Sequence, residues 1–361
     1  MSDKLKEARK IIDEVDGEIA RLFLRRMEAA RLVAEYKQEM GMEILDPKRE
    51  AEVIEKNSTM IEDDEMRGYY VSFLKNMMSV SRSYQAKLIE GMKVAYSGTA
   101  GAFAHIATMR LFPTAKKIAY PSFEAAYLAV ESGECDAAVL PTENSNNGEV
   151  GQVTDLMFSG SLYINGMLEL AVTQDLLGVP GATTADIKEV ISHQQALGQC
   201  GEFIRSHGFV TREYSNTALA ADKVAELGEK SIGAIASREA AEIYGLVVLE
   251  RNINDSRTNT TKFAVFSRSE KKIKEEKGVH SILLFTVRHE AGALAKAIDI
   301  IGNYGFNMQA LRSRPMKELL WQYYFYVEVE GNINSDAGKA MVAELSVVCD
   351  KLRIVGSFQK K

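Results

Sequence analysis

A polar stretch from Pro141 to Gly148 combines a carboxylate, amides and hydroxyls, which are groups that can orient a small polar ligand. The apolar run Ala137–Leu140 directly before it is typical of a buried parallel strand. The apolar spacing from Glu149 to Phe158 predicts a helix directly after it. Open α/β sheets bind ligands at the carboxyl ends of such strands, so we expect a binding loop here. The alternative is an ordinary turn rich in asparagine and glycine.

Cations interrupt the apolar stripe of a long helix near the amino terminus. The stripe recurs at steps of three and four residues and consists of Ile12, Val15, Ile19, Leu22, Ala30 and Val33. Arg9, Arg26 and Lys37 fall on the same stripe. One such cation could snorkel outward, but three together favour an anionic ligand, because unpaired buried charge is costly. A rise of about 1.5 Å per residue separates Arg9 from Arg26 by roughly 25 Å, so one small ligand would need them from different chains.

Two further helices complete an all-helical segment that extends from Met1 to about Glu90. Asp46 is a cap and Pro47 a first helical residue, which places Arg49 and Glu50 in the first turn of the second helix. The third helix, about Asp64 to Leu88, carries its core residues on one face. Polar side chains stand on that same face at Ser81 and Gln85.

This helical pattern resembles the AroQ-type chorismate mutase domain over nearly its whole length. The resemblance implies an intertwined helical dimer that binds chorismate, a dianion, with Arg9 supplied by the partner chain. The substrate-binding residues of that family match Arg9, Arg26, Lys37, Asp46, Arg49, Glu50, Ser81 and Gln85. Lys37 and Gln85 would donate to the ether oxygen that gains negative charge, while Asp46 and Glu50 would hold the substrate hydroxyl. The rearrangement needs no acid, base or nucleophile.

From Gly91 the pattern changes to short apolar runs that alternate with helical segments. The first set of expected strands is Val94–Tyr96, Lys117–Tyr120 and Ala137–Leu140, with helices near Ala104–Leu111 and Phe123–Glu131. A second set of strands follows at Glu189–Ile191, Val210–Tyr214 and Ile232–Ala236. Two sets indicate two α/β lobes with a cleft between them. The strand Lys262–Phe266 would return the chain to the first lobe.

Five segments of this region resemble prephenate dehydratase, in that family's order. They are Gly98–Ala107, Pro141–Gly151, Ser192–Cys200, Asn216–Ala218 and Thr261–Phe263. The resemblance implies that Thr261 assists departure of the ring hydroxyl of prephenate, as a hydrogen-bond donor rather than a titrating acid. It also implies substrate contacts from the other motif residues, namely Asn144, Ser145, Ser192, Gln199, Asn216, Thr217, Lys262 and Phe263. Without it, Thr261 would be an ordinary strand residue, and neither His105 nor His193 has an evident carboxylate partner in the sequence.

Among the departures from the dehydratase pattern, two matter. Ala104 replaces a hydroxyl residue, and Lys262 stands where the family usually has arginine. Arginine offers a fixed fork to a carboxylate and lysine a point charge, so the departure at Lys262 bears on substrate orientation.

After a charged linker, Ser269–Gly278, the expected order of elements is βαββαβ, a ferredoxin-like unit. The strands are Ser281–Val287, Met308–Ser313, Trp321–Val329 and Arg353–Phe358, and the helices are Gly292–Tyr304 and Ser335–Val348. This unit resembles the ACT domain of phenylalanine-regulated dehydratases, with departures at Ala295 and Arg312. The resemblance implies effector contacts for L-phenylalanine at Gly292, Ala293, Leu294, Asn307, Ser313 and Arg314. The alternative is a dimerisation domain without a ligand.

Composition limits the remaining choices. The chain has 361 residues and a net charge of −6, which gives no nucleic-acid or membrane-surface footprint. No signal peptide or membrane-spanning run is expected. Three widely spaced cysteines without a metal-ligand pattern indicate a reducing cytoplasm.

We therefore expect a multidomain enzyme of phenylalanine biosynthesis that needs no cofactor or metal. Its expected parts are an all-α mutase at 1–90, a two-lobed α/β dehydratase at 91–270 and a ferredoxin-like regulatory domain at 278–361. We expect a homo-oligomer, either a dimer or a tetramer. The alternatives are a mutase fused to a non-catalytic amino-acid-binding module, and a dehydratase that prefers arogenate.

The departure at Lys262 generates a first prediction. The substitution Lys262→Arg should leave the dehydratase turnover number within a few-fold and lower the Michaelis constant, because a guanidinium fork holds a carboxylate in one orientation. Steady-state kinetics with prephenate measure both constants. A large loss of turnover would instead show that this lysine is specifically required.

Overall fold

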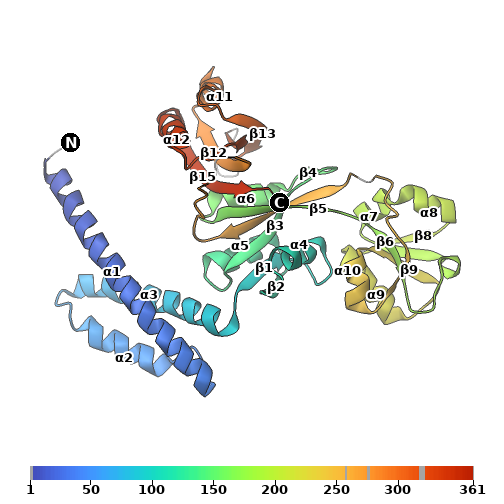
Figure 1. The fold of residues 1–361 in the computed structure, drawn as a ribbon, viewed down its shortest axis with the longest axis horizontal. Helices are drawn as coiled ribbons and strands as arrows, with labels where there is room; N and C mark the ends of the chain where they lie inside the picture. The colour runs from blue at the N-terminus through green and yellow to red at the C-terminus, as the bar shows by residue number, and fades with distance from the viewer. Residues whose placement is uncertain (1–2, 257, 275–276, 317–321, 361) are drawn as a thin grey trace. The chain divides into compact units, whose positions relative to one another are not determined.

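The computed structural model describes residues 3–256, 258–274, 277–316 and 322–360. The chain forms two compact units, residues 1–93 and residues 94–361 (Figure 1).

The first unit consists of three helices, as predicted. They are α1 (Asp3–Met40), α2 (Pro47–Ser58) and α3 (Asp64–Glu90). The carboxylate of Asp46 caps α2 by accepting from the backbone N–H of Arg49 at 3.0 Å. Ala30 and Ala34 are buried against the rest of the unit, but the amino-terminal part of the α1 stripe is exposed, with Ile12 56% and Leu22 57% accessible. The single chain therefore leaves a long apolar face of α1 uncovered.

The second unit begins with a mixed sheet in the order β2-β1-β3-β11-β5, with the short β4 paired to β3. Its strands are β1 (Lys93–Ser97), β2 (Lys116–Tyr120), β3 (Ala137–Asn144), β4 (Gly148–Glu149), β5 (Tyr163–Ala171) and β11 (Thr260–Ser267). The helices of this lobe are α4 (Phe103–Leu111), α5 (Phe123–Glu131) and α6 (Gly151–Ser159). Strand β3 is parallel to β1 and antiparallel to β11, so β11 does return the chain to the first lobe.

One sequence expectation was wrong here. The binding loop was placed at Pro141–Gly148, but β3 continues through Asn144 and the helix begins at Gly151. The polar side chains stay in the strand because β11 supplies a ladder partner from a segment more than a hundred residues away. Only Ser145–Asn147 form the turn, and β4 then pairs back onto β3.

A second sheet has the order β10-β6-β9-β7-β8. Its strands are β6 (Asp175–Gly178), β7 (Glu189–Ser192), β8 (Val210–Glu213), β9 (Ile232–Ala236) and β10 (Val247–Glu250). Its helices are α7 (Gln194–Gln199), α8 (Gly201–His207), α9 (Thr217–Leu227) and α10 (Arg238–Tyr244), with a 3₁₀ turn η1 at Thr184–Asp186. The sequence reading predicted β7, β8 and β9 but missed β6 and β10, each only four residues long, as well as β5.

The final sheet has the order β13-β14-β12-β15 and all its pairs are antiparallel. Its elements are β12 (Val279–Val287), α11 (Ala293–Asn303), β13 (Asn307–Pro315), β14 (Tyr323–Glu330), α12 (Asp336–Val348) and β15 (Cys349–Gln359). The predicted βαββαβ order is confirmed. Trp321, the predicted start of the third strand, and residues 275 and 276 of the predicted linker lie outside the described residues.

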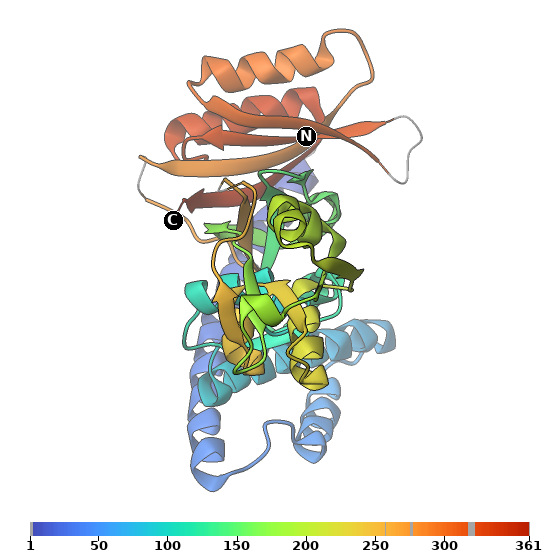
Figure 2. The same cartoon turned by 90° about the vertical axis from the view of Figure 1, so that its right-hand side faces the viewer.

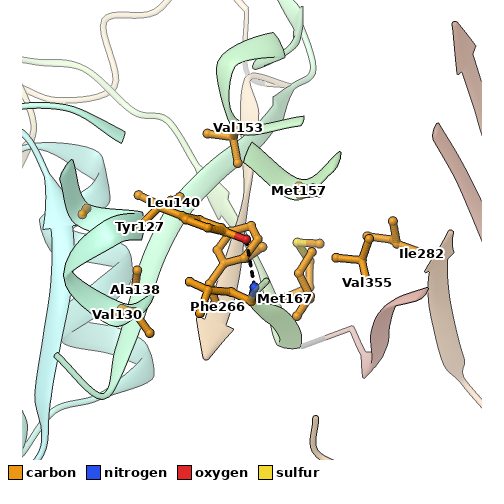
Figure 3. Packing of buried hydrophobic residues seen from close by; sticks show 14 of the residues in the cluster. Tyr127, Val130, Ala138, Leu140, Val153, Met157, Met167, Phe266, Ile282 and Val355 are labelled. Atoms are coloured by element: carbon orange, nitrogen blue, oxygen red, sulfur yellow. Dashed lines mark hydrogen bonds between the residues drawn. The ribbon is translucent and has the colours of Figure 1, made fainter. Parts of the chain in front are cut away.

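The two faces of this C-terminal sheet have different partners. Leu283, Phe285 and Val327 pack in a core with residues of α11 and α12. Figure 2 shows both helices on one side of the sheet. Side chains that alternate with these along the strands, including Ile282 and Tyr326, join the core of the first lobe. Figure 3 shows Ile282 in this core. The C-terminal sheet and the first lobe therefore share one hydrophobic core, which explains why they form a single compact unit.

Tyr127 provides a test of this shared core. Its ring is fully buried against Phe266, and its hydroxyl accepts a hydrogen bond from the backbone N–H of Leu162 at 3.0 Å (Figure 3). Tyr127→Phe should destabilise the second unit by about 1–3 kcal/mol, because it leaves a buried donor unpaired. Urea unfolding of the full chain, followed at the transition of this unit, measures the change. The exposed Tyr36 serves as control, and an equal effect of Tyr36→Phe would contradict the assignment.

Candidate functional site

The helical unit contains a cavity of about 450 Å³ lined by charged and polar side chains. Seven of the eight residues predicted to bind a dianion line it, and they are Arg26, Lys37, Asp46, Arg49, Glu50, Ser81 and Gln85. They come from all three helices and the segment that connects α1 to α2. The eighth residue, Arg9, is exposed and is not among the lining residues, as expected if it serves a site in another chain.

Hydrogen bonds arrange the donors of this cavity. Arg26 donates to the hydroxyl of Ser81, and the ammonium of Lys37 donates to the carbonyl of Ile44. Burial lowers the pKa of Arg26 from its ordinary value. Within the described residues, the Oε1 atom of Gln85 is buried without a hydrogen-bond partner. Such an orphaned polar atom, on a side chain that lines the cavity, indicates that a polar ligand completes the site.

The sequence reading missed Arg82, which also lines this cavity. Its guanidinium forms an ion pair with Glu50, one of the two residues predicted to hold the substrate hydroxyl. The available signal was its position beside Ser81 on the polar face of α3. Glu50 therefore approaches a ligand with its carboxylate already bound to a cation.

The second site lies on the ladder between β3 and β11. Asn144 is the register partner of Thr261, and its Nδ2 lies 2.9 Å from the Thr261 hydroxyl oxygen. The Asn144 Oδ1 accepts from the backbone N–H groups of Asn146 and Asn147 at 3.0 and 3.1 Å, which fixes the amide orientation. Since the Thr261 oxygen accepts from Asn144, its own hydrogen remains available to donate to a ligand.

Asn259 is a second residue that the sequence reading missed. Its Oδ1 accepts from Nδ2 of Asn144 at 2.8 Å, and the residue is 3% exposed. Its Nδ2 is buried without a partner within the described residues. The signal was its position two residues before Thr261, directly before the first residue of β11. Asn144, Asn259 and Thr261 thus form one connected polar cluster.

The remaining predicted dehydratase residues fall into two groups. Ser145 donates from its hydroxyl to the carbonyl of Thr258 at 2.9 Å and so closes the turn against β11, and Phe263 is 2% exposed. The others belong to the second lobe and are Ser192, Gln199, Asn216 and Thr217.

Two of these second-lobe side chains have structural partners. Ser192 is fully buried and donates to the carbonyl of Ile235, at 2.5 Å, which joins β7 to β9. Asn216 caps α9 by accepting from Leu219 N–H at 2.7 Å. Their roles as substrate contacts stay predictions.

Lys262 does not point along the same face as Thr261. Its ammonium lies 2.9 Å from Oε2 of Glu143, its register partner on β3. Burial acts to lower the pKa of Lys262, but the hydrogen bond to Glu143 and the charges of Glu328, Glu143 and Glu169 together raise it above its ordinary value. Lys262 is therefore a charged residue held by a carboxylate of its own chain.

His105 and His193, the two histidines considered as bases in the sequence analysis, have structural partners. Nδ1 of His105 accepts from the Gly101 backbone N–H at 3.1 Å, and burial and nearby Lys117 lower the pKa of its ring. Nδ1 of His193 accepts from the Gln195 N–H at 3.2 Å as a helix cap. Both Nδ1 ring nitrogens therefore accept from backbone N–H groups, and neither of these two hydrogen bonds involves a carboxylate.

The predicted effector residues are divided between two elements. Gly292 has a φ of 83° and precedes α11, which Ala293 and Leu294 begin, and Leu294 lines a cavity of about 660 Å³ with residues of β12 and β14. Asn307 and Ser313 are exposed on β13. Arg314 instead donates from Nε to Oδ1 of Asp155 in the first lobe at 3.0 Å.

Residues 3–256, 258–274, 277–316 and 322–360 hold no group of three or more His, Cys, Asp or Glu side chains that could bind a metal ion. None of the helices in these ranges is both long and apolar enough to cross a membrane.

Models of two known protein families match different parts of the chain. Residues 8–86 match the family model for chorismate mutase type II, and residues 94–271 match the model for prephenate dehydratase. A bifunctional chorismate mutase/prephenate dehydratase from Aquifex aeolicus is 30% identical over 99% of this chain and 98% of its own. An arogenate dehydratase/prephenate dehydratase from Arabidopsis thaliana is 31% identical over 74% of this chain and 72% of its own.

Solved structures resemble the second unit. A prephenate dehydratase from Arthrobacter aurescens in complex with L-Phe superposes with a TM-score of 0.69 at 26% identity, covering 74% of this chain and 90% of its own. GqqA, described as a novel type of quorum quenching acylase, gives a TM-score of 0.69 at 31% identity, with 74% and 98% covered. Fold, sites and comparisons define a two-site enzyme that joins a helical mutase unit to an α/β dehydratase. The chain belongs to the family of bifunctional chorismate mutase/prephenate dehydratases.

Proposed function

We propose that this chain converts chorismate to prephenate and prephenate to phenylpyruvate, two successive steps of phenylalanine biosynthesis. The coexistence of two different sites in one chain carries the proposal. A cation-lined cavity lies in the helical unit, and a hydroxyl–amide cluster lies on the ladder between β3 and β11. A relative with both activities in its name aligns over nearly the full length of the chain. We assign the mutase to residues 1–90, the dehydratase to 91–270 and a regulatory domain to 278–361.

The helical cavity suits a rearrangement that needs orientation and charge stabilisation. Arg26 and Arg49 are suited to the two carboxylates of chorismate. Lys37 and Gln85 would donate to the ether oxygen as the carbon–oxygen bond breaks and negative charge collects there. Asp46 and Glu50 would hold the substrate hydroxyl. All bonds rearrange within the substrate, so no proton or electron enters from the protein.

The ladder site suits a decarboxylation coupled to loss of hydroxide. The electrons of the broken carbon–carboxylate bond move into the ring, which becomes aromatic, and the ring hydroxyl takes one proton from the solvent and leaves as water. Thr261 would donate a hydrogen bond to that departing oxygen, while Asn144 donates to the Thr261 oxygen and fixes its rotamer. Product release yields phenylpyruvate and carbon dioxide.

Thr261 offers a clean separation of the two activities. We expect Thr261→Ala to remove dehydratase activity and leave mutase activity unchanged, because the two sites lie in different units. The measurements are phenylpyruvate formation from prephenate and prephenate formation from chorismate. Thr260→Ala is the matched control, since its side chain lies on the other face of the strand. Retention of both activities in Thr261→Ala would remove Thr261 from the mechanism.

We further propose that L-phenylalanine binds the C-terminal domain as a feedback effector and that the protein is a homo-oligomer. The support is the ferredoxin-like topology, the solved relative in complex with L-Phe and the uncovered apolar face of α1. We place the enzyme in the cytoplasm, where thiols such as those of Cys135 and Cys200, which form no disulfide, stay reduced. Faster release of phenylalanine from arogenate than of phenylpyruvate from prephenate would assign the arogenate preference instead.

A mixed oligomer tests whether Arg9 serves the partner's site. Chains carrying Arg9→Ala and chains carrying Gln85→Ala should each lack mutase activity. After co-refolding in equal amounts, half of the dimers are mixed and hold one intact site of two, so about a quarter of wild-type activity should return. Light scattering confirms assembly in the same samples. No recovery in assembled mixed dimers would place Arg9 in its own chain's site.

A further inference from the structure

The paired strands β3 and β11, called the catalytic ladder below, have two faces that carry different side-chain pairs. In the register of β3 and β11, Asn144 is opposite Thr261 and Glu143 is opposite Lys262. Side chains alternate along a strand, so the first pair lies on one face and the second pair on the other. Each pair is joined at 2.9 Å, the first by a hydrogen bond and the second by an ion pair. A displacement of Glu143 therefore also moves the backbone that presents Asn144.

Glu143 is shared by two cations from different domains. Oε2 accepts from Lys262 of β11, and Oε1 accepts from Arg312 of β13. The three side chains are each about a quarter exposed, at 24%, 27% and 25%. The Arg312 guanidinium also lies 5.3 Å from the ring centroid of Tyr326, which is 4% exposed. Both Lys262 and Arg312 are positions where the sequence departs from the family pattern, and the structure joins them through one carboxylate.

Strand β13 also has two faces. Its residues alternate between exposed and half-buried from Asn307 to Pro315. Asn307 and Ser313, which the family resemblance predicts as effector contacts, are on the exposed face. Arg312 and Arg314 are on the other face, where both reach carboxylates of the first lobe. A ligand on the exposed face of β13 would therefore contact the same strand whose other face is paired with Glu143.

Arg314 forms a second contact between β13 and the first lobe, near the hairpin formed by β3 and β4. Its Nε lies 3.0 Å from Oδ1 of Asp155, and its Nη1 lies 3.7 Å from Oε2 of Glu149. Glu149, on β4, is the register partner of Glu143 on β3. Two arginines of β13 thus face two glutamates of the β3–β4 hairpin. The hairpin turn contains the N–H groups that orient the Asn144 amide.

We propose that Glu143 is a positioning residue for the dehydratase and that Arg312 is the contact through which the C-terminal domain sets the Asn144–Thr261 geometry. This inference rests on the proposed function and deepens it, because it names the residues that link the effector domain to the reaction. Glu143 and Arg312 act through Asn144 and Thr261 and do not touch the substrate. The path consists of two ion pairs and the alternation of side chains along three strands, β13, β3 and β11.

The test uses full-length chains carrying Arg312→Gln, Arg312→Lys or Arg212→Gln. Arg312→Gln removes the charge, and Arg312→Lys keeps it. Arg212→Gln breaks a comparable arginine–glutamate pair, with Glu189 in the second lobe, and serves as the matched control. Each chain is assayed with prephenate at zero and saturating L-phenylalanine. Calorimetry measures L-phenylalanine binding, and hydrogen exchange is followed in peptides covering 141–150.

The proposal predicts a specific combination of results. Arg312→Gln should bind L-phenylalanine within a few-fold of wild type, yet the effect of the effector on the dehydratase rate should shrink at least fivefold, since typical allosteric coupling is about 5–150-fold. Its turnover number without effector should fall while the Michaelis constant changes little. Exchange in residues 141–150 should be several-fold faster. Arg312→Lys should restore all three properties, and Arg212→Gln should match wild type.

The outcomes also separate this inference from the proposed function. If wild-type protein forms no phenylpyruvate, the dehydratase assignment fails. Hydrogen exchange in residues 141–150 then tests by itself whether Arg312 holds the β3–β4 hairpin. If the dehydratase works but ignores L-phenylalanine, the feedback assignment fails, and turnover and exchange decide the positioning role. Unchanged exchange at 141–150 together with an unchanged rate and effector response in Arg312→Gln overturns the inference. A merely structural role predicts lower stability with the effector response intact, which would overturn it equally.

Discussion

The antiparallel pairing of β3 with β11 is the constraint on which the dehydratase depends. It brings Asn144 and Thr261 together from positions more than a hundred residues apart, and its register decides which side chains share a face. A slip of one residue would exchange Thr261 for Lys262 at the site. The neighbouring strands and the core around Phe266 hold that register, so packing of apolar side chains maintains a polar geometry.

Charge plays a different part in each unit. The helical cavity gathers more cationic than anionic side chains because its proposed ligand supplies two carboxylates. Around the ladder, the cations meet carboxylates of the protein itself, as with Lys262 and Glu143. Cationic side chains therefore line the proposed substrate cavity in one unit, and in the other they pair with carboxylates that hold strands together. Lys262 belongs to the second group, which explains how lysine can replace an arginine there: an ammonium satisfies a single carboxylate oxygen.

Much of this architecture could be predicted from the sequence. Periodicity located the three helices, and the cations on one helix face identified Arg26 and Lys37, which line the cavity. The family resemblance supplied the other five predicted lining residues, Asp46, Arg49, Glu50, Ser81 and Gln85. What periodicity could not supply was pairing between distant segments. Pro141–Asn144 looks like a loop because it is polar, but it forms a strand because the distant β11 pairs with it. Arg82 and Asn259 were missed because their partners are remote in sequence. The role of Glu143 depends on contacts from two domains, which no local pattern encodes.

Supplying chorismate alone to the purified full-length protein tests the central claim most directly. Prephenate and phenylpyruvate are followed together over time. The account predicts that prephenate rises first and that phenylpyruvate then accumulates at its expense, with one carbon dioxide released for each phenylpyruvate formed. Accumulation of prephenate without phenylpyruvate would show that the α/β unit binds ligands without catalysing the second step, and would contradict the account of the ladder.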